Sequence, residues 1–441
     1  MRNYILSVIK AHKQGLPVGI YSVCSANPYV LHAAMAQAEK DKSTVLIEAT
    51  SNQVNQFGGY TGMTPRDFRR YISRIAKSRR FDSKRVILGG DHLGPQAWKD
   101  EPASVAMEKA ENLVSSFVEE GFTKIHLDTS MPCSDDTLPL AEEIISERTA
   151  RLALVAEEAY ARSSPEGPAP VYVIGTEVPS PGGALESMDT IHITTVQDAE
   201  QAVLYNQKAF QKQRLDNAWE RVIALVVQPG VEFGDTNITE YDRSRASGLS
   251  QWIAGIPRLV FEAHSTDYQT LDCLKQMVED HFSILKVGPA LTYAFREGVF
   301  ALAAIESEWF DGKKGITLSR IREVLEKVML ERPEYWQKHY SSIVSEQALA
   351  RKYSYSDRIR YYWFEPSVES ALNQLFKNLS KAMPASLVSQ FLPVQYQRLR
   401  AGILNNHPID FLQDKIMDVT AMYSTATAQD KHSYLFSGEK E

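Results

Sequence analysis

The sequence predicts a TIM (β/α)8 barrel with an α-helical C-terminal extension. Short apolar runs rich in β-branched residues alternate with longer helical patterns through residues 1–310, and this alternation is typical of a parallel sheet buried on both faces. Eight such runs occur, which is the number that closes a TIM barrel. The turn after the first run, CSANPYV, lacks the glycine fingerprint of a nucleotide-binding open sheet. An open doubly wound sheet is therefore the less favoured alternative.

We expect the eight strands, in chain order, over residues 17–24, 44–50, 85–92, 124–128, 171–178, 221–230, 258–265 and 283–291. A helical pattern follows each of them. The third strand, for example, precedes SVAMEKAENLVSSFVEEG, whose last residue, Gly121, stands where a glycine commonly ends a helix. The proline-rich stretch 163–170 joins a helix directly to the fifth strand, so we interpret it as a loop within the barrel.

The pattern changes after Phe310. A turn-like break, DGKKG, comes first. The remaining residues are rich in helical patterns and aromatic side chains and poor in strand patterns. We therefore predict two domains, a barrel over residues 1–310 and a helical region over residues 311–441.

Composition excludes several classes of protein. The chain has 441 residues, a formal net charge of −7 and 44% hydrophobic residues, which are ordinary values for a soluble globular protein. Acidic and basic residues are interspersed without a basic stripe, so we expect no nucleic-acid partner. Three cysteines without a CxxC pair fit a reducing, cytoplasmic location. The first fifteen residues predict an amphipathic helix, and no apolar run approaches the roughly 20 residues of a membrane span.

Polar side chains gather near the C-terminal ends of the predicted strands, where TIM-barrel active sites lie. Alternate strand residues face the barrel interior, and in the seventh strand Glu262 and His264 share the parity opposite to the apolar residues. The same reasoning directs inward Glu48, Thr50, His92, His126, Asp128, Glu177, Gln228 and Lys286. Asp91 has the opposite parity unless its strand ends at Gly89-Gly90. A cluster of buried charges must be paired, metal-bound or catalytic.

These residue types suit two kinds of chemistry. His92, Glu177 and His264 offer two imidazoles and a carboxylate, a set suited to zinc or another divalent metal such as manganese, with positions left for substrate oxygens. The alternative is Lys286 as a Schiff-base nucleophile, which requires a lowered pKa. Neighbouring acids would raise that pKa instead, so the metal interpretation is favoured.

Two glycine pairs and one arginine segment leave alternatives open. The loops that contain Gly58-Gly59 and Gly182-Gly183 are either phosphate cradles or tight turns. Neither is followed by GK[ST], and we expect no nucleotide cofactor. The segment SDRIRYYW, residues 356–363, places two arginines beside aromatic residues and serves packing, subunit contact or anion binding.

The same stretches resemble a known family. Similarity to the Z subunit (GatZ/KbaZ type) of class II D-tagatose-1,6-bisphosphate aldolase is carried by IEATSNQVNQFGGYTGMTP, ILGGDHLGP, KIHLD, YVIGTEVPSPGG, VVQPGVEF, FEAHSTDYQT, LKVGPALT and DRIRYYW. The resemblance runs from about Gly15 to the C-terminus. It implies a TIM-barrel protein of galactitol or N-acetylgalactosamine catabolism that stabilises a separate catalytic Y subunit and is not itself catalytic. Relatives also carry the name tagatose-6-phosphate kinase, and the lack of a kinase motif argues against that activity here.

The Z family in turn is similar to the class II aldolases proper. That resemblance implies that Asp91 is an acid/base and that His92 and His264 are zinc ligands. It also implies that Glu177 with Gly182-Gly183 corresponds to the glutamate that precedes a glycine loop in the aldolases. Two departures weaken an independent activity. Gln228, a poor zinc ligand, stands where the aldolases have a histidine, and KVGPALT lacks the acids of their substrate-binding segment.

Two functions follow from these observations. The first is an accessory, stabilising subunit that docks the catalytic Y subunit, with an aromatic interface formed by Tyr335, Trp336, Tyr361, Tyr362 and Trp363. The alternative is a metal-dependent aldolase or 4-epimerase that acts alone on a sugar or sugar phosphate. In that case Asp91 or Asp128 moves protons, and substrate contacts come from Glu48, Gln228, Glu262, Lys286, Gly182 and Gly183. Either function is compatible with a homo-oligomer.

Overall fold

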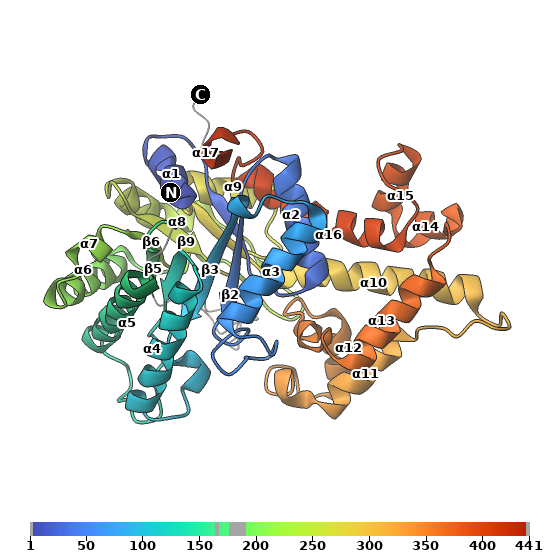
Figure 1. Cartoon of the computed structure of the whole chain (residues 1–441), viewed down its shortest axis with the longest axis horizontal. Coiled ribbons are helices and arrows are strands. Elements are labelled where there is room, and N and C mark those ends of the chain that lie inside the picture. Colours follow the sequence, from blue (N-terminus) through green and yellow to red (C-terminus); the bar gives the residue numbers. More distant parts are fainter. Residues whose placement is uncertain (1–2, 164–166, 176–190, 438–441) are drawn as a thin grey trace.

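A computed structural model of the chain describes residues 3–163, 167–175 and 191–437. Eight parallel strands close into a barrel in the spatial order β1-β10-β9-β6-β5-β4-β3-β2 (Figure 1). Their bounds are β1 Ile20–Val23, β2 Val45–Thr50, β3 Val86–Leu93, β4 Lys124–Leu127, β5 Val171–Gly175, β6 Val222–Val226, β9 Val260–Ala263 and β10 Ile284–Val287. The predicted TIM barrel is confirmed, since each predicted run supplies one strand. A hairpin of β7 (Glu232–Phe233) and β8 (Ile238–Thr239), which was not predicted, follows β6.

Helices that follow the strands form the outer layer of the barrel (Figure 1). They are α2 Pro28–Lys40, α3 Pro65–Arg79, α4 Ala103–Glu119, α5 Glu142–Ser163, α6 Val196–Lys212, α8 Arg243–Ala254, α9 Leu271–Glu279 and α10 Pro289–Phe310, with a short α7 Asp216–Trp219 after α6. Local sequence explains several of their ends. Thr64 and Thr195 form capping boxes at the starts of α3 and α6. Gly121, with a φ of 82°, follows the end of α4 as predicted.

The barrel interior is divided along the strand axis. The inward residues near the strand starts are apolar, and they pack in one cluster with Ile5, Val8 and Ile9 of helix α1 (Tyr4–Lys13). Helix α1 therefore closes the N-terminal end of the barrel. Two residues further along the strands, the inward side chains become polar: Ile20 is followed by Ser22 and Leu46 by Glu48.

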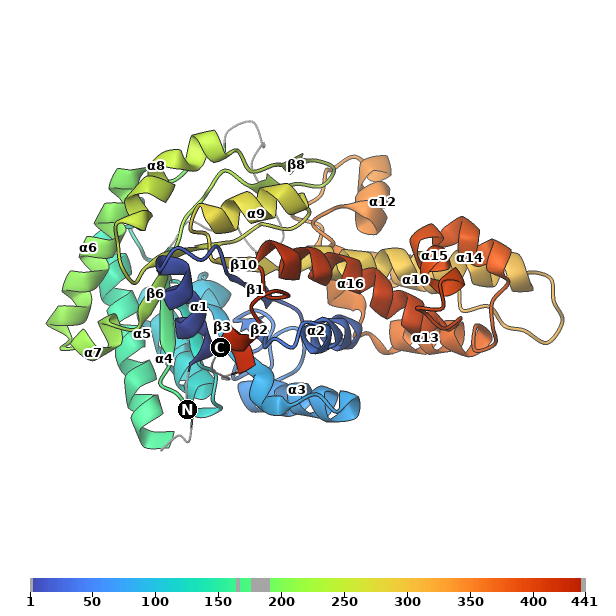
Figure 2. The ribbon, with the colours of Figure 1, turned by 90° about the horizontal axis from the view of Figure 1, so that it is seen from above.

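The regular secondary structure beyond Phe310 is entirely helical in the described residues. The helices are α11 Ile321–Glu331, α12 Val344–Tyr353, α13 Pro366–Asn378, α14 Ala385–Phe391, α15 Pro393–Arg400, α16 Pro408–Ala426 and α17 Tyr434–Ser437. Most of this region extends away from the barrel, but α16 returns to it and packs against α2, α9 and α10 (Figure 2). No helix in the described ranges is both long and apolar enough to span a bilayer.

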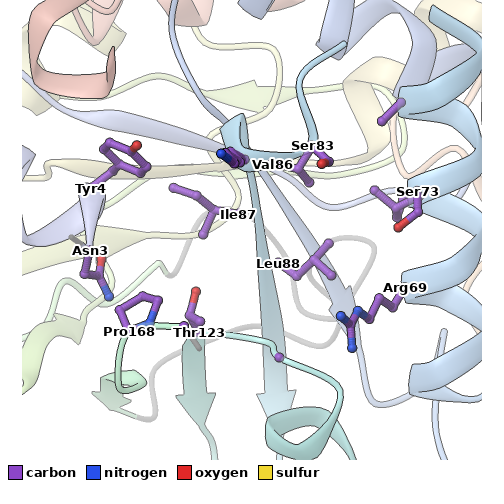
Figure 3. A pocket seen from close by; sticks show the side chains of 15 residues that line it. Asn3, Tyr4, Arg69, Ser73, Ser83, Val86, Ile87, Leu88, Thr123 and Pro168 are labelled. Atoms are coloured by element: carbon purple, nitrogen blue, oxygen red, sulfur yellow. The ribbon is translucent and has the colours of Figure 1, made fainter. Parts of the chain in front are cut away.

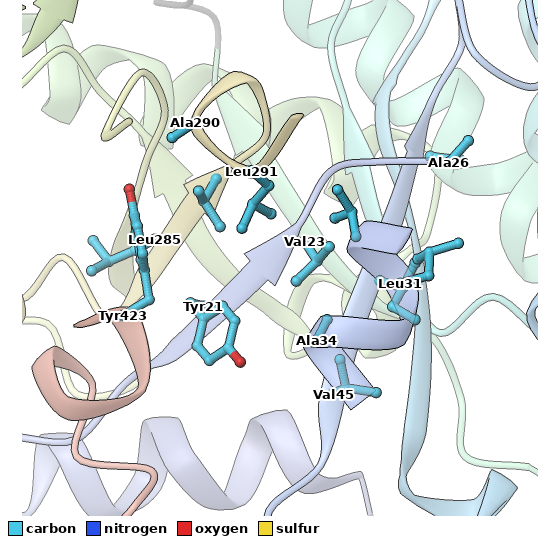
Figure 4. Close-up of a cluster of buried hydrophobic side chains, with 14 of the residues drawn as sticks. Tyr21, Val23, Ala26, Leu31, Ala34, Val45, Leu285, Ala290, Leu291 and Tyr423 are labelled. Atoms are coloured by element: carbon cyan, nitrogen blue, oxygen red, sulfur yellow. The ribbon is translucent and has the colours of Figure 1, made fainter. Parts of the chain in front are cut away.

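Helix α16 completes the outer layer beside β1 and β10. The ring of Tyr423 lies 6.0 Å from that of Tyr21 on β1, and Leu285 of β10 lies in the same apolar cluster (Figure 4). The Tyr423 hydroxyl donates to the carbonyl of Thr266 over 2.7 Å, and the Gly19 N–H donates to the carbonyl of Thr427 over 2.9 Å. Helix α16 and its C-cap residue Thr427 are thus hydrogen-bonded to the barrel at both ends of the strands, to Thr266 after β9 and to Gly19 before β1.

A cavity of about 370 Å3 lies at the start of β3, between α1 and α3 (Figure 3). Its lining includes Tyr4, Arg69, Ser73 and Thr123 and contains no histidine, cysteine or carboxylate among the described residues. Histidines, cysteines and carboxylates are the usual metal ligands, and histidines and carboxylates are the commonest general acids and bases. We therefore place the candidate site at the other end of the strands.

Candidate active site at the barrel mouth

A buried ion-pair network with Glu48 at its centre occupies the upper half of the barrel. The upper half is the part of the interior toward the C-terminal ends of the strands, and the lower half is the part toward their N-terminal ends. Lys124 Nζ lies 2.8 Å from a Glu48 carboxylate oxygen and 2.6 Å from Glu262. Lys286 Nζ lies 2.7 Å from Glu48, and the Ser22 hydroxyl donates to the same carboxylate over 2.6 Å. These side chains come from β1, β2, β4, β9 and β10, so the network links strands across the barrel interior.

Strand β3 places two adjacent residues, Asp91 and His92, at the mouth. The strand predicted over residues 85–92 does not end at Gly89-Gly90, the condition given for an inward Asp91, because β3 continues to Leu93. Its register with β4 shifts between Gly90 and Leu93, and His92 has a φ of 49°. Such an irregularity turns neighbouring side chains toward one face, which an ideal strand cannot do.

The glycine before this irregularity has a steric reason. A Cβ on Gly89 would lie 2.7 Å from Glu48 Cγ, so a larger residue would displace the central carboxylate.

Asp91 connects the ion pairs to a group of three histidines. Its carboxylate lies 3.0 Å from His126 Nδ1, 3.2 Å from His92 Nδ1 and 2.9 Å from Lys286 Nζ. His264 Nε2 lies 2.9 Å from Glu262. The three imidazole rings have centroids 4.8 to 5.2 Å apart. Each histidine therefore has one ring nitrogen directed at a carboxylate.

Charge coupling sets the protonation of this cluster. Burial alone would raise the pKa of Asp91, but His92 and Lys286 hold it well below its usual range. Burial opposes the charge on Lys286, yet the surrounding carboxylates raise its pKa well above the ordinary value. Burial lowers the pKa of His264 to about 3, although the bond to Glu262 opposes this shift. His264 is thus neutral at physiological pH, and Lys286 is a charged partner of acids instead of a Schiff-base nucleophile.

The cluster fits a divalent metal ion. One ligand atom from each of Asp91, His126, Glu262 and His264 lies within 4.8 Å of all the others. His126 Nδ1 lies 3.0 Å from the Asp91 carboxylate and 3.2 Å from the backbone nitrogen of His92, whereas the buried Nε2 has no hydrogen-bond partner among the described residues. His92 Nε2 is equally without a partner there. Carboxylates that orient a histidine so that its other nitrogen is free are typical of metal sites.

The formal charge of the cluster also favours a cation. The carboxylates of Glu48, Asp91, Asp128 and Glu262 and the ammonium groups of Lys124 and Lys286 are all buried. Without the imidazoles, these four acids and two bases leave two negative charges. Burial lowers the pKa of His92, but the Asp91 carboxylate beside it outweighs this and raises it, so a protonated His92 offsets one of these charges where no metal is bound, and a divalent ion would balance both.

A cavity of about 110 Å3 opens above the cluster. Asp91, His92, His264 and Lys286 form its floor, and Tyr60 from the loop after β2 lines its side. Arg360 and Tyr361 from the C-terminal helical region line it as well. The mouth is therefore built from both parts of the chain, and it is accessible to a small molecule.

The remaining predicted residues have different outcomes. Asp128 is buried and accepts from Ser130 Oγ over 2.6 Å. Gln228, expected to point inward, is absent from the cavity lining. Its Oε1 atom accepts hydrogen bonds from the N–H groups of Gly230 and Val231 and so stabilises the turn that follows β6. Glu177, Gly182 and Gly183 lie outside the described residues.

The loop with Gly58-Gly59 is a tight turn. The N–H groups of Gly58, Gly59, Tyr60 and Thr61 all donate within residues 52–61. They are therefore not available to a phosphate group.

Two contributions to the site were not predicted. Lys124 has the same parity as His126, which the sequence analysis directed inward, so its position could have been found. Arg360 belongs to the segment for which packing, subunit contact and anion binding were left open, and Tyr361 was predicted at a subunit interface; neither was placed at the mouth. No local pattern places them near strands that lie more than seventy residues earlier in the chain.

A family model of the D-tagatose-1,6-bisphosphate aldolase subunit GatZ/KbaZ-like proteins matches residues 5–428. The chain belongs to this family. It is also similar to the crystal structure of a probable tagatose 6 phosphate kinase from Sinorhizobium meliloti 1021, with a TM-score of 0.85, 44% identity, and coverage of 92% of this chain and 100% of that one. Similarity to fructose-bisphosphate aldolase from Campylobacter jejuni is much weaker, at a TM-score of 0.43 and 13% identity over 84% of this chain and 90% of that one, and it supports no argument about the site.

Proposed function

We propose that the barrel mouth is a working site for metal-dependent carbonyl chemistry on a sugar, namely aldol cleavage or 4-epimerisation by cleavage and re-addition. The observation that carries this proposal is the buried network of three histidines, four carboxylates and two lysines below an open cavity. Burying each charge costs several kcal/mol before pairing. Apolar residues already fill the lower half of the same barrel, so packing alone does not require the charges.

The side chains divide the work as follows. His126, His264 and Glu262 are the candidates to hold the metal, with His92 beside them. A bound divalent ion would polarise a sugar carbonyl or stabilise the developing oxyanion. Asp91 orients His92 and His126. Asp128, buried near the mouth and outside the lysine pairs, is the candidate to move a proton. Lys124 and Lys286 both pair with Glu48, and they hold the pKa of Glu262 well below its usual range although burial opposes this.

The accessory role remains a second candidate, because one surface suits a partner. Five large apolar side chains on and around α11 and α12 are 42% to 78% exposed: Leu330, Ile343, Val344, Leu349 and Tyr353. Clustered exposed apolar residues often mark interfaces. The predicted aromatic interface is wrong for Trp336, Tyr362 and Trp363, since all three are buried. In this proposal the exposed group binds the catalytic subunit of a cytoplasmic tagatose-bisphosphate aldolase of galactitol or N-acetylgalactosamine catabolism. The sequence has no nucleotide-phosphate loop, so we do not propose a kinase.

The decisive experiment measures triose phosphate release from D-tagatose 1,6-bisphosphate, and interconversion of D-tagatose with its 4-epimer, by the purified chain with zinc or manganese. His264→Ala removes one imidazole from the cluster, and His192→Ala removes an exposed histidine as the control. We expect turnover that chelator and His264→Ala reduce at least 100-fold, while the control is unchanged. No turnover alone, combined with stimulation of a class II catalytic partner that His264→Ala leaves intact, would establish the accessory role instead.

A further inference from the structure

A short segment of the C-terminal region reaches across the barrel mouth. It consists of Asp357 and the 3-10 helix η5, Arg358–Tyr362. Arg360 and Tyr361 of this segment line the same cavity as Asp91, His92 and His264. Residues far beyond the last barrel strand thus face the candidate catalytic groups directly.

The segment is held in place by buried charges. Asp357, buried and with a φ of 45°, accepts from Thr292 Oγ1 over 2.6 Å and from Arg296 Nε over 3.3 Å, both on α10. The Arg296 guanidinium lies 3.9 Å from the centroid of the Tyr293 ring. On the other side, Ser354 Oγ donates to Asp235 over 2.6 Å. Because α10 and the loop after β7 both anchor it, the segment presents Arg360 in a fixed position.

Arg360 differs from the other cation in the cavity lining. Lys286 is fully engaged by Glu48 and Asp91, whereas no carboxylate lies within ion-pair distance of the Arg360 guanidinium among the described residues. Its donors contact only neutral groups there: the carbonyls of Ser356 and Asp357, and the Tyr361 hydroxyl at 2.9 Å. The Tyr361 ring also supports it from 4.5 Å.

Other anion-binding features near the mouth are already used. The amide groups at the start of α10, Gly288 N–H and Ala290 N–H, donate to Asp267 over 3.0 and 2.8 Å. The glycine turn at Gly58-Gly59 donates within itself. Arg360 therefore lines the cavity with a guanidinium group that forms no ion pair in the described part of the chain, and it can bind an anion there.

We propose that Arg360 binds the anionic group of a sugar substrate, a phosphate or a carboxylate, while the carbonyl end of that sugar lies at the histidine cluster. The planar guanidinium matches both anions with two parallel hydrogen bonds. Tyr60 and Tyr361, whose rings lie 4.8 Å apart in an edge contact, form an aromatic wall beside it. The sugar part of this inference rests on the proposed function; the anion part stands on Arg360 itself.

Binding of three probes tests the inference: D-tagatose, D-tagatose 6-phosphate and D-tagaturonate, titrated calorimetrically into the whole chain. Arg360→Gln removes the positive charge but keeps a polar side chain. Arg360→Lys keeps the charge but removes the planar guanidinium group that can donate two parallel hydrogen bonds. Arg400→Gln is the matched control, because Arg400 likewise lies over a tyrosine, Tyr396, at 5.9 Å but is exposed and absent from the cavity lining.

We expect Arg360→Gln to weaken binding of one or both anionic sugars by about 10- to 100-fold, with neutral D-tagatose unaffected. The anion that suffers the loss identifies the substrate class. Arg360→Lys should lose less, and Arg400→Gln nothing. Equal losses for neutral and anionic sugars, or no loss at all, would overturn the inference, as would absence of anion binding by the unaltered chain. Arg360-dependent binding without turnover would uphold it while the proposed catalysis fails.

Discussion

The two halves of the barrel interior differ sharply, although the same strands build both. Near the strand starts the inward residues are Ile20, Leu46, Val260 and Ile284, closed off by α1. Two residues further along they are Ser22, Glu48, Glu262 and Lys286, joined by ion pairs and hydrogen bonds. The lower half stabilises the fold through apolar burial, and the upper half places charges where a ligand can reach them. In these strands, the inward residue that stabilises the fold and the inward residue that belongs to the candidate site are thus only two positions apart.

Lys124→Met tests the upper half most severely. It leaves the fully buried carboxylates of Glu48 and Glu262 without the ammonium group between them. Breaking a buried pair costs about 3 to 5 kcal/mol, so we expect a loss of that size in the free energy of urea unfolding. Lys109→Met, which breaks a partly exposed pair with Glu101, should cost less than about 1 kcal/mol. Equal stability of the two variants would show that the network is not an electrostatic unit.

Glu232 offers a buried carboxyl without a lysine partner among the described residues. Burial raises its pKa to about 7, so the folded state holds a proton that the unfolded state has released between pH 4.5 and 7. Stability therefore falls as pH rises through this window. Glu232→Gln should increase the free energy of unfolding at pH 8 by up to about 3 kcal/mol, with little change at pH 4. A stabilisation that is equal at both pH values would refute the assignment.

The smallest effect should come from the lower half. Ile20→Val removes one methyl group from a fully buried position, which typically costs about 0.5 to 1.5 kcal/mol. Turnover and ligand binding should not change. Ser22→Ala, two residues along the same strand, removes the hydroxyl that donates to Glu48 and should alter activity at a similar cost in stability. Loss of activity in Ile20→Val but not in Ser22→Ala would reverse the proposed division.

Strand parity was sufficient to predict much of the site. It directed Glu48, His126, Glu262 and Lys286 inward, and the structure brings them together. It failed for Asp91, because the register shift in β3 is not visible in the sequence pattern. It failed also for Gln228, whose amide oxygen serves a local turn instead of the mouth.

The contribution of the C-terminal region was beyond local reasoning. Arg360 and Tyr361 reach the cavity through contacts between segments remote in sequence, such as Asp357 with Thr292 and Arg296. Helical periodicity predicts that such a region is helical. It does not predict which turn of it faces the barrel.

The position of α16 has a consequence for how the chain is made on the ribosome. Strand β1 is synthesised long before helix α16, yet Tyr21 is covered by Tyr423. Domains commonly fold in order of emergence, but here the nascent barrel keeps an uncovered seam until α16 has been synthesised. The unfinished polypeptide therefore presents apolar surface to chaperones for as long as residues 408–426 are missing.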